Sequence, residues 1–77
     1  MTQASFWQQI FGEAEPLGTF WLRIKHTPDG PIARLPSGRT VIFPFEPQPP
    51  IDSLCNVILR KTKLGELLGQ WTGEKAD

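Results

Sequence analysis

The sequence predicts a small, mainly β domain, and three observations lead to this fold class. Apolar and polar side chains alternate between Thr19 and His26, which is the period of a half-buried strand. Turn sequences rich in proline and glycine recur at short intervals along the chain. No long helical pattern separates the strand-like segments, so we expect about five antiparallel strands. Closure into an OB-like or SH3-like barrel would remove the bare edges of so small a sheet.

Residues 1–17 are expected to form an N-terminal segment with one or two turns of helix. Ser5 is a possible N-cap, and Gly12 would end the helix. The apolar side chains of the segment recur at helical spacing: Phe6, Trp7, Ile10 and Phe11. So short a helix is stable only when these side chains dock on another surface. The segment is therefore expected either to cover the core or to form an interface.

The barrel domain is expected over residues 18–71, and its first strand runs from Thr19 to His26. This strand places two sets of side chains on opposite faces: Phe20, Leu22 and Ile24 toward the core, and Trp21, Arg23 and Lys25 away from it. The sequence Thr-Pro-Asp-Gly that follows predicts a turn, because proline presets φ and glycine tolerates a positive φ.

The next two expected strands are Ile32–Leu35 and Arg39–Phe45, which are joined by a Pro-Ser-Gly turn. The second of these is rich in β-branched and aromatic residues. Prolines recur from Pro44 to Pro50, and proline lacks the N–H that a sheet ladder requires. This stretch is therefore expected to be an extended connection.

Leu54–Lys61 is the next expected strand, with three apolar side chains on one face: Cys55, Val57 and Leu59. Residues 65–71 fit two interpretations, because their apolar spacing suits a helix as well as a strand. Gly65 and Gly69 disfavour a helix of that length, so we expect a final strand. The polar tail, residues 72–77, is expected to be disordered.

The chain is short and its charge is balanced, which limits the functions it can carry. It has 77 residues with 8 basic and 8 acidic side chains, so it can build one core but hardly a deep active-site cleft. The segment from Pro16 to Gly65 holds seven basic and three acidic side chains, a net charge of +4, and the compensating acids lie near the ends. The middle of the chain can therefore keep a local positive potential.

Neither catalysis nor metal binding is indicated. Cys55 is the only cysteine, which excludes an internal disulfide and favours a cytoplasmic location. His26 stands without a catalytic partner, and the serines occupy cap or turn positions. No apolar run approaches the roughly 20 residues that cross a bilayer. We expect no enzymatic activity, no cofactor, no metal and no membrane association.

The candidate binding residues are aromatic and basic. Trp21, Arg23 and Lys25 recur at every second position of one strand, and an exposed aromatic ring among cations can stack a base and neutralise its phosphate. The alternative is that the N-terminal helix covers Trp21. A second basic group could gather at one end of the sheet: Arg34, Arg39, Arg60, Lys61 and Lys63. Its alternative role is that of ordinary solvated charges.

The stretch Gly-Pro-Ile-Ala-Arg-Leu-Pro-Ser-Gly-Arg-Thr-Val-Ile-Phe-Pro, residues 30–44, resembles the central part of a TRAM domain, a small OB-like RNA-binding barrel. The later run Val-Ile-Leu-Arg-Lys, residues 57–61, resembles the next strand of that family, and the similarity covers about Gly18 to Gly69. The family usually has a second glycine where Pro31 stands, a Pro-Gly-Glu-like turn at residues 50–53, and a strongly basic character. The resemblance implies these RNA-contacting candidates: Arg34, Arg39, Phe43, Arg60 and Lys61.

Two functions from different classes follow. The first is a non-catalytic module that binds single-stranded or structured RNA through backbone cations and aromatic stacking. The second is a protein-interaction module that docks through its apolar N-terminal segment: Phe6, Trp7 and Phe11. Phosphate-driven binding weakens steeply with salt, whereas apolar docking does not, so a salt titration separates them.

Overall fold

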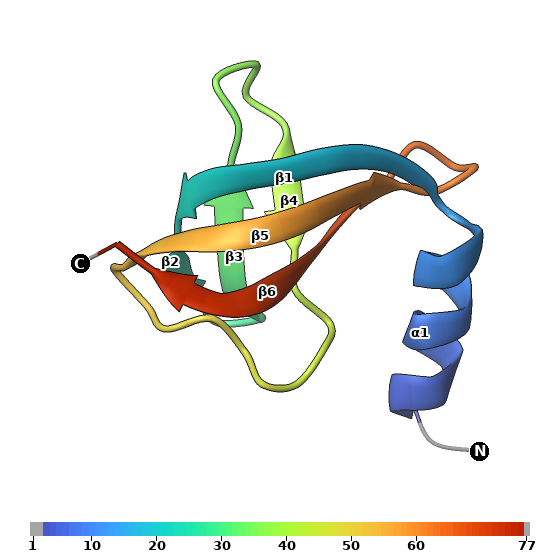
Figure 1. Ribbon diagram of the computed structural model, residues 1–77, viewed down its shortest axis with the longest axis horizontal. Helices are drawn as coiled ribbons and strands as arrows, with labels where there is room; N and C mark the ends of the chain where they lie inside the picture. Colours follow the sequence, from blue (N-terminus) through green and yellow to red (C-terminus); the bar gives the residue numbers. More distant parts are fainter. Residues whose placement is uncertain (1–2, 77) are drawn as a thin grey trace.

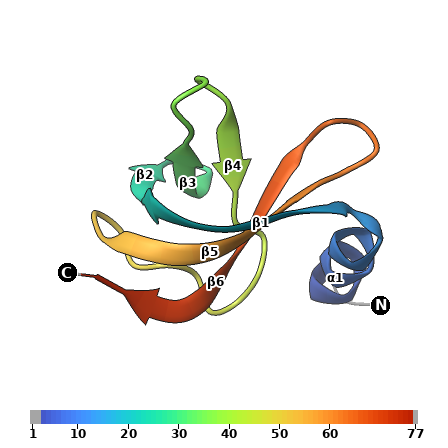
Figure 2. The ribbon, with the colours of Figure 1, turned by 45° about the horizontal axis from the view of Figure 1, so that its top comes forward.

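The computed structural model describes residues 3–76 and shows a mainly β protein with one short helix (Figure 1). The helix and strands have these bounds: α1 Gln3–Glu13, β1 Glu15–Arg23, β2 Lys25–Thr27, β3 Gly30–Arg34, β4 Thr40–Ile42, β5 Leu54–Lys61 and β6 Leu67–Lys75. Ser5 lies inside α1 and is not its N-cap. The helix stands to one side of the sheet, beside the start of β1 (Figure 2).

Over residues 3–76 the strands form one sheet of six with the order β1-β5-β6-β4-β3-β2. Neighbouring strands pair antiparallel, except β4 and β6, which pair parallel. The sixth strand arises because the expected Thr19–His26 strand is divided at Ile24. The Ile24 N–H donates to the Ser53 carbonyl at 3.0 Å, and the Ile24 carbonyl accepts from Asp52 N–H at 2.8 Å. The two outer strands of the sheet, β1 and β2, are therefore consecutive in the chain.

The last strand settles the ambiguity at residues 65–71 and extends beyond them. Leu67–Lys75 is a strand, so the strand prediction is confirmed, and residues 72–75 of the expected disordered tail belong to this strand. The tail pairs with the first half of β5: Thr72 Oγ1 donates to the Asn56 carbonyl at 3.0 Å, and Ala76 N–H donates to the Leu54 carbonyl at 2.9 Å. These hydrogen bonds pair the carbonyls of Leu54 and Asn56 and the N–H of Ala76, which would otherwise bond to water.

The main core lies between the strands and matches most of the expected inward faces. Its buried members are Leu22, Ile24, Ala33, Val41, Phe43, Cys55, Val57, Leu59 and Leu67. Phe20 was expected among them but is 43% exposed. β1 is an edge strand of the sheet and pairs only with β5. No strand therefore lies beside Phe20 on its other side.

A second, smaller packing site holds α1 against the sheet. Ala14, Phe45 and Leu68 are buried but lie outside the main core cluster. The Phe11 ring packs edge-on against Phe45, with 5.0 Å between ring centroids. Aromatic pairs of this geometry add about 0.5–1.5 kcal/mol to the burial of their surface. The helix is thus docked through its C-terminal turn and the connection between β4 and β5.

Candidate nucleic-acid interface

The strip formed by Trp21, Arg23 and Lys25, here called the Trp21 strip, is exposed along β1 and β2. All three side chains are exposed, Trp21 to 49%, while Leu22 and Ile24 between them are buried. The docking site of α1 involves Phe11 and Phe45, so the helix does not cover the Trp21 ring. An uncovered indole and two cations therefore occupy one face at every second position.

Backbone register and one hydrogen bond fix the basic part of the Trp21 strip. Arg23 donates from Nη1 to the Asp52 carbonyl at 2.9 Å, which orients the guanidinium where β1 meets the connection before β5. Lys25 pairs with Ile32 in the β2–β3 ladder. Continuing that register past Ile24 brings exposed Arg34 to the level of Arg23. Arg34 is therefore a third cation, which lies next to the Trp21 strip.

An apolar cleft of about 450 Å³ adjoins the Trp21 strip. Its lining includes three half-exposed side chains, Leu17 at 39%, Phe20 at 43% and Trp21 at 49%. Leu35 and Pro36, beside the turn between β3 and β4, also line it. This surface was not predicted, because Phe20 was expected in the core and Leu17 in the N-terminal segment.

Arg60 was expected to contact RNA, with a solvated charge as the alternative, but in the structure it anchors the helix. Its Nη1 donates to the carbonyls of Phe11 at 3.1 Å, Gly12 at 3.5 Å and Ala14 at 3.4 Å. Its guanidinium also lies over the Phe11 ring, 4.9 Å from the centroid. The last carbonyls of a helix lack intrahelical donors, and a cation at that end supplies them. Arg60 is half-buried and is better described as a C-terminal cap than as a phosphate contact.

Arg60→Ala is expected to release α1 while leaving the sheet folded. The substitution removes charged hydrogen bonds, worth about 1.5–3 kcal/mol, and the cation–π contact with Phe11. Hydrogen exchange of the α1 amides should accelerate, while the β5 and β6 amides stay protected. Lys61→Ala is the matched control, since it removes the neighbouring cation. Unchanged protection of α1 in Arg60→Ala would show that the helix docks without this cap.

The other basic candidates are Arg39 and Lys63, which lie in two turns, and Lys61, which lies at the end of β5. Arg39 donates from Nη2 to the Gly65 carbonyl, which joins the turn before β4 to the turn between β5 and β6. This bond brings the turn that carries exposed Lys63 toward the β3–β4 turn, as the sequence suggested. Lys61 is half-buried at the end of β5, where it pairs with Glu15 and Leu67.

Phe43 cannot stack a base from where it lies. It is only 4% exposed and belongs to the main core. The chain alternates from β4 into the following connection, so Val41 and Phe43 face inward while Ile42 faces outward. This burial does not support the resemblance-based assignment of Phe43 as an RNA contact, which stays a prediction.

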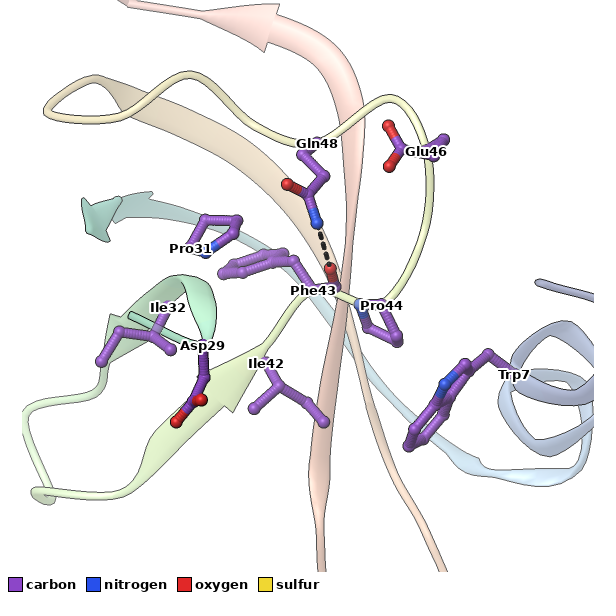
Figure 3. A pocket seen from close by; sticks show the side chains of 9 residues that line it. All are labelled: Trp7, Asp29, Pro31, Ile32, Ile42, Phe43, Pro44, Glu46 and Gln48. Atoms are coloured by element: carbon purple, nitrogen blue, oxygen red, sulfur yellow. Dashed lines mark hydrogen bonds between the residues drawn. The ribbon is translucent and has the colours of Figure 1, made fainter. Parts of the chain in front are cut away.

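A second cleft lies beside β3, β4 and the connection that follows β4, and is here called the β3–β4 cleft (Figure 3). Its volume is about 530 Å³, and its lining is Trp7, Asp29, Pro31, Ile32, Ile42, Phe43, Pro44, Glu46 and Gln48. Figure 3 shows the Trp7 ring projecting from α1 toward Pro44 and Ile42. Ile32 and Ile42 are paired in the β3–β4 ladder and form an apolar floor.

A third groove, of about 330 Å³, separates α1 from the turn between β5 and β6. Phe6 is 52% exposed there and Leu64 is 88% exposed. Of the three side chains expected to dock a protein partner, Phe6 and Trp7 line this groove, but Phe11 is occupied by Phe45 and Arg60.

Among residues 3–76 no cluster of three histidine, cysteine or acidic side chains could hold a metal ion. No helix in this part of the chain is long and apolar enough to span a membrane. Comparisons with protein-family models, curated proteins and solved structures gave no match. The TRAM-like resemblance therefore stays a prediction.

Proposed function

We propose that the protein is a non-catalytic module that binds single-stranded RNA along the Trp21 strip. The observation that carries this proposal is the uncovered Trp21 ring, which stands in line with exposed Arg23 and Lys25. A base can stack on an indole face, while cations at every second residue follow the phosphates of its strand. Exposed Arg34 extends this positive track onto β3.

Sheet topology supports the OB-like barrel that this function would use. Taken as one strand bent at Ile24, β1 and β2 reduce the sheet to five strands. The two edge strands, β1 and β2, then form one continuous strand, and we propose that this strand closes the sheet into a barrel. Barrels of this type bind oligonucleotides on one strand face and its bordering loops.

Charge and shape set the mode of binding. Stacking on Trp21 and Phe20 accepts any base, because every base has a π-face. The Trp21 strip has few other groups for reading base edges, so sequence preference should be weak. The chain as a whole is neutral, so affinity should depend on local phosphate contacts and fall as salt rises.

Trp21→Ala is expected to weaken binding of a short mixed-sequence RNA by about 1–3 kcal/mol, the usual effect of removing one stacking ring. Fluorescence anisotropy of a labelled RNA at about 50 mM salt measures the change, because electrostatic binding is strongest at low salt. The melting temperature should change little, since half of the Trp21 side chain is already exposed. Leu64→Ala, which truncates an apolar side chain that is 88% exposed, serves as the control and should bind like the parent.

The double variant Lys25→Ala with Arg34→Ala tests the cations. Losing two phosphate contacts on a single strand should make the negative slope of log K against log salt shallower by about 1.4. Lys75→Ala, which removes an exposed cation at the end of β6, should leave the slope unchanged. A parent protein that fails to bind the RNA at low salt, or a Trp21→Ala variant that binds it equally well, would contradict the proposal.

A further inference from the structure

The β3–β4 cleft differs in charge from the Trp21 strip. Its described lining contains two carboxylates, Asp29 and Glu46, and no basic side chain. Asp29 comes from the turn between β2 and β3, and Glu46 from the connection between β4 and β5, so the two enter the cleft from separate segments. A phosphate chain would be repelled here, whereas a cation would be attracted.

The other walls of the cleft suit the stem of a long cationic side chain. Half-buried Ile32, Ile42 and Pro44 offer apolar surface, along which the methylenes of arginine or lysine can lie. The Trp7 ring projects over this surface from α1 (Figure 3). An indole face attracts a guanidinium or ammonium group within about 6 Å of its centroid.

We propose that the β3–β4 cleft binds an arginine-containing, extended segment of a partner protein. The guanidinium reaches the carboxylate of Glu46, its stem covers Ile42 and Pro44, and Trp7 closes one side, while Asp29 stands on the opposite side of the cleft (Figure 3). Arginine fits better than lysine, because its planar fork can bond a carboxylate and stack on an indole at the same time. This site borders the proposed RNA surface at Lys25, which pairs with Ile32, but it does not depend on RNA binding.

The polar groups at the rim favour a peptide over a small cation. The Gln48 side-chain amide donates to the Phe43 carbonyl at 3.5 Å, a long bond that leaves its oxygen to accept from the backbone of a bound segment. Lys25 pairs with Ile32 and stands beside the cleft on the same face. Its charge would repel a second cation there, so the arginine is directed to the opposite side of the cleft, which carries Glu46 (Figure 3).

The test is a nuclear magnetic resonance titration of the labelled protein with two acetylated, amidated peptides. One has the sequence Ala-Leu-Arg-Pro-Leu-Ala, and the other carries the neutral isostere citrulline in place of arginine. We expect the arginine peptide to shift the Trp7 indole resonance and the amides of residues 42–48, and to bind at least tenfold tighter than the citrulline peptide.

Variants that neutralise the carboxylates without changing side-chain size test the charge. Glu46→Gln should weaken the arginine peptide at least tenfold, and the double variant with Asp29→Asn at least as much. Asp29→Asn alone should have a smaller effect, because this carboxylate stands on the opposite side of the cleft (Figure 3). Glu66→Gln removes an acid from the turn between β5 and β6 and should have no effect. RNA binding of the double variant should stay unchanged, which separates this site from the RNA surface.

Four results would overturn the inference. The first is equal affinity for the arginine and citrulline peptides, and the second is arginine-peptide affinity that the double variant retains. The third is binding of free arginine amide as tight as that of the peptide, which would make the cleft a small-cation site. The fourth is movement of the same resonances by RNA alone or by raising the protein concentration, which would assign the cleft to RNA or to a second copy of the chain.

Discussion

Val57→Asp is expected to unfold the protein. Val57 is 0% exposed in the middle of β5 and faces Phe20 on β1 and Trp71 on β6. An unpaired carboxylate at this position would lose its hydration without gaining a partner, which costs more than about 4 kcal/mol. A chain of this length has a total stability of about 4–12 kcal/mol, so little or none would remain.

Circular dichroism and thermal melting measure this effect. Val57→Ala is the first control and should stay folded with a lower melting temperature, since it leaves only a small cavity. Ile58→Asp is the second control, because the neighbouring side chain points to the opposite face and is partly exposed; it should be much less harmful. A cooperative Val57→Asp transition within a few degrees of the parent would mean that Val57 faces solvent.

Gly69→Ala is expected to destabilise the core by overpacking. A Cβ atom at this position would lie 2.5 Å from Cε1 of Phe43 and 2.9 Å from Cγ1 of Val41. Both neighbours are buried, so neither can move aside without disturbing the core. Overpacking of this kind costs about 1–3 kcal/mol, and the melting temperature of a domain this small falls by about 4–8 °C for each kcal/mol.

Gly12→Ala is the matched control, because the same methyl group meets no atom within 4 Å there. Gly12 lies in α1, where alanine is favoured over glycine by about 0.5–1 kcal/mol. This variant should melt at the parent temperature or above it. Equal melting temperatures for Gly69→Ala and the parent would show that β6 can shift away from Phe43.

Local patterns in the sequence predicted most of the sheet. The alternation in β5 placed Cys55, Val57 and Leu59 in the core, where the structure has them. The same reasoning failed for Phe20, because alternation identifies a face of a strand but not whether another strand covers that face. It also missed the extension of β6, whose polar residues are ordered by pairing with β5 and not by burial.

The candidate binding residues were likewise predicted only in part. The alternation placed Trp21, Arg23 and Lys25 on one face, but it left open whether the helix covers Trp21, which the structure shows to be 49% exposed. The role of Arg60 was not predictable, because the carbonyls that it binds lie 46 to 49 residues away in the chain. The β3–β4 cleft was missed for the same reason, since Trp7, Asp29 and Glu46 come from three separate segments.

The cap formed by Arg60 links two distant surfaces. Arg60 holds the C-terminal end of α1, and the same helix carries Trp7 into the β3–β4 cleft. Docking of α1 and occupancy of the cleft then form a thermodynamic cycle: a ligand that contacts Trp7 only in the docked state favours docking, and docking raises its affinity by the same factor. Arg60→Ala should therefore weaken cleft ligands that it never touches, and a bound ligand should restore hydrogen-exchange protection to α1.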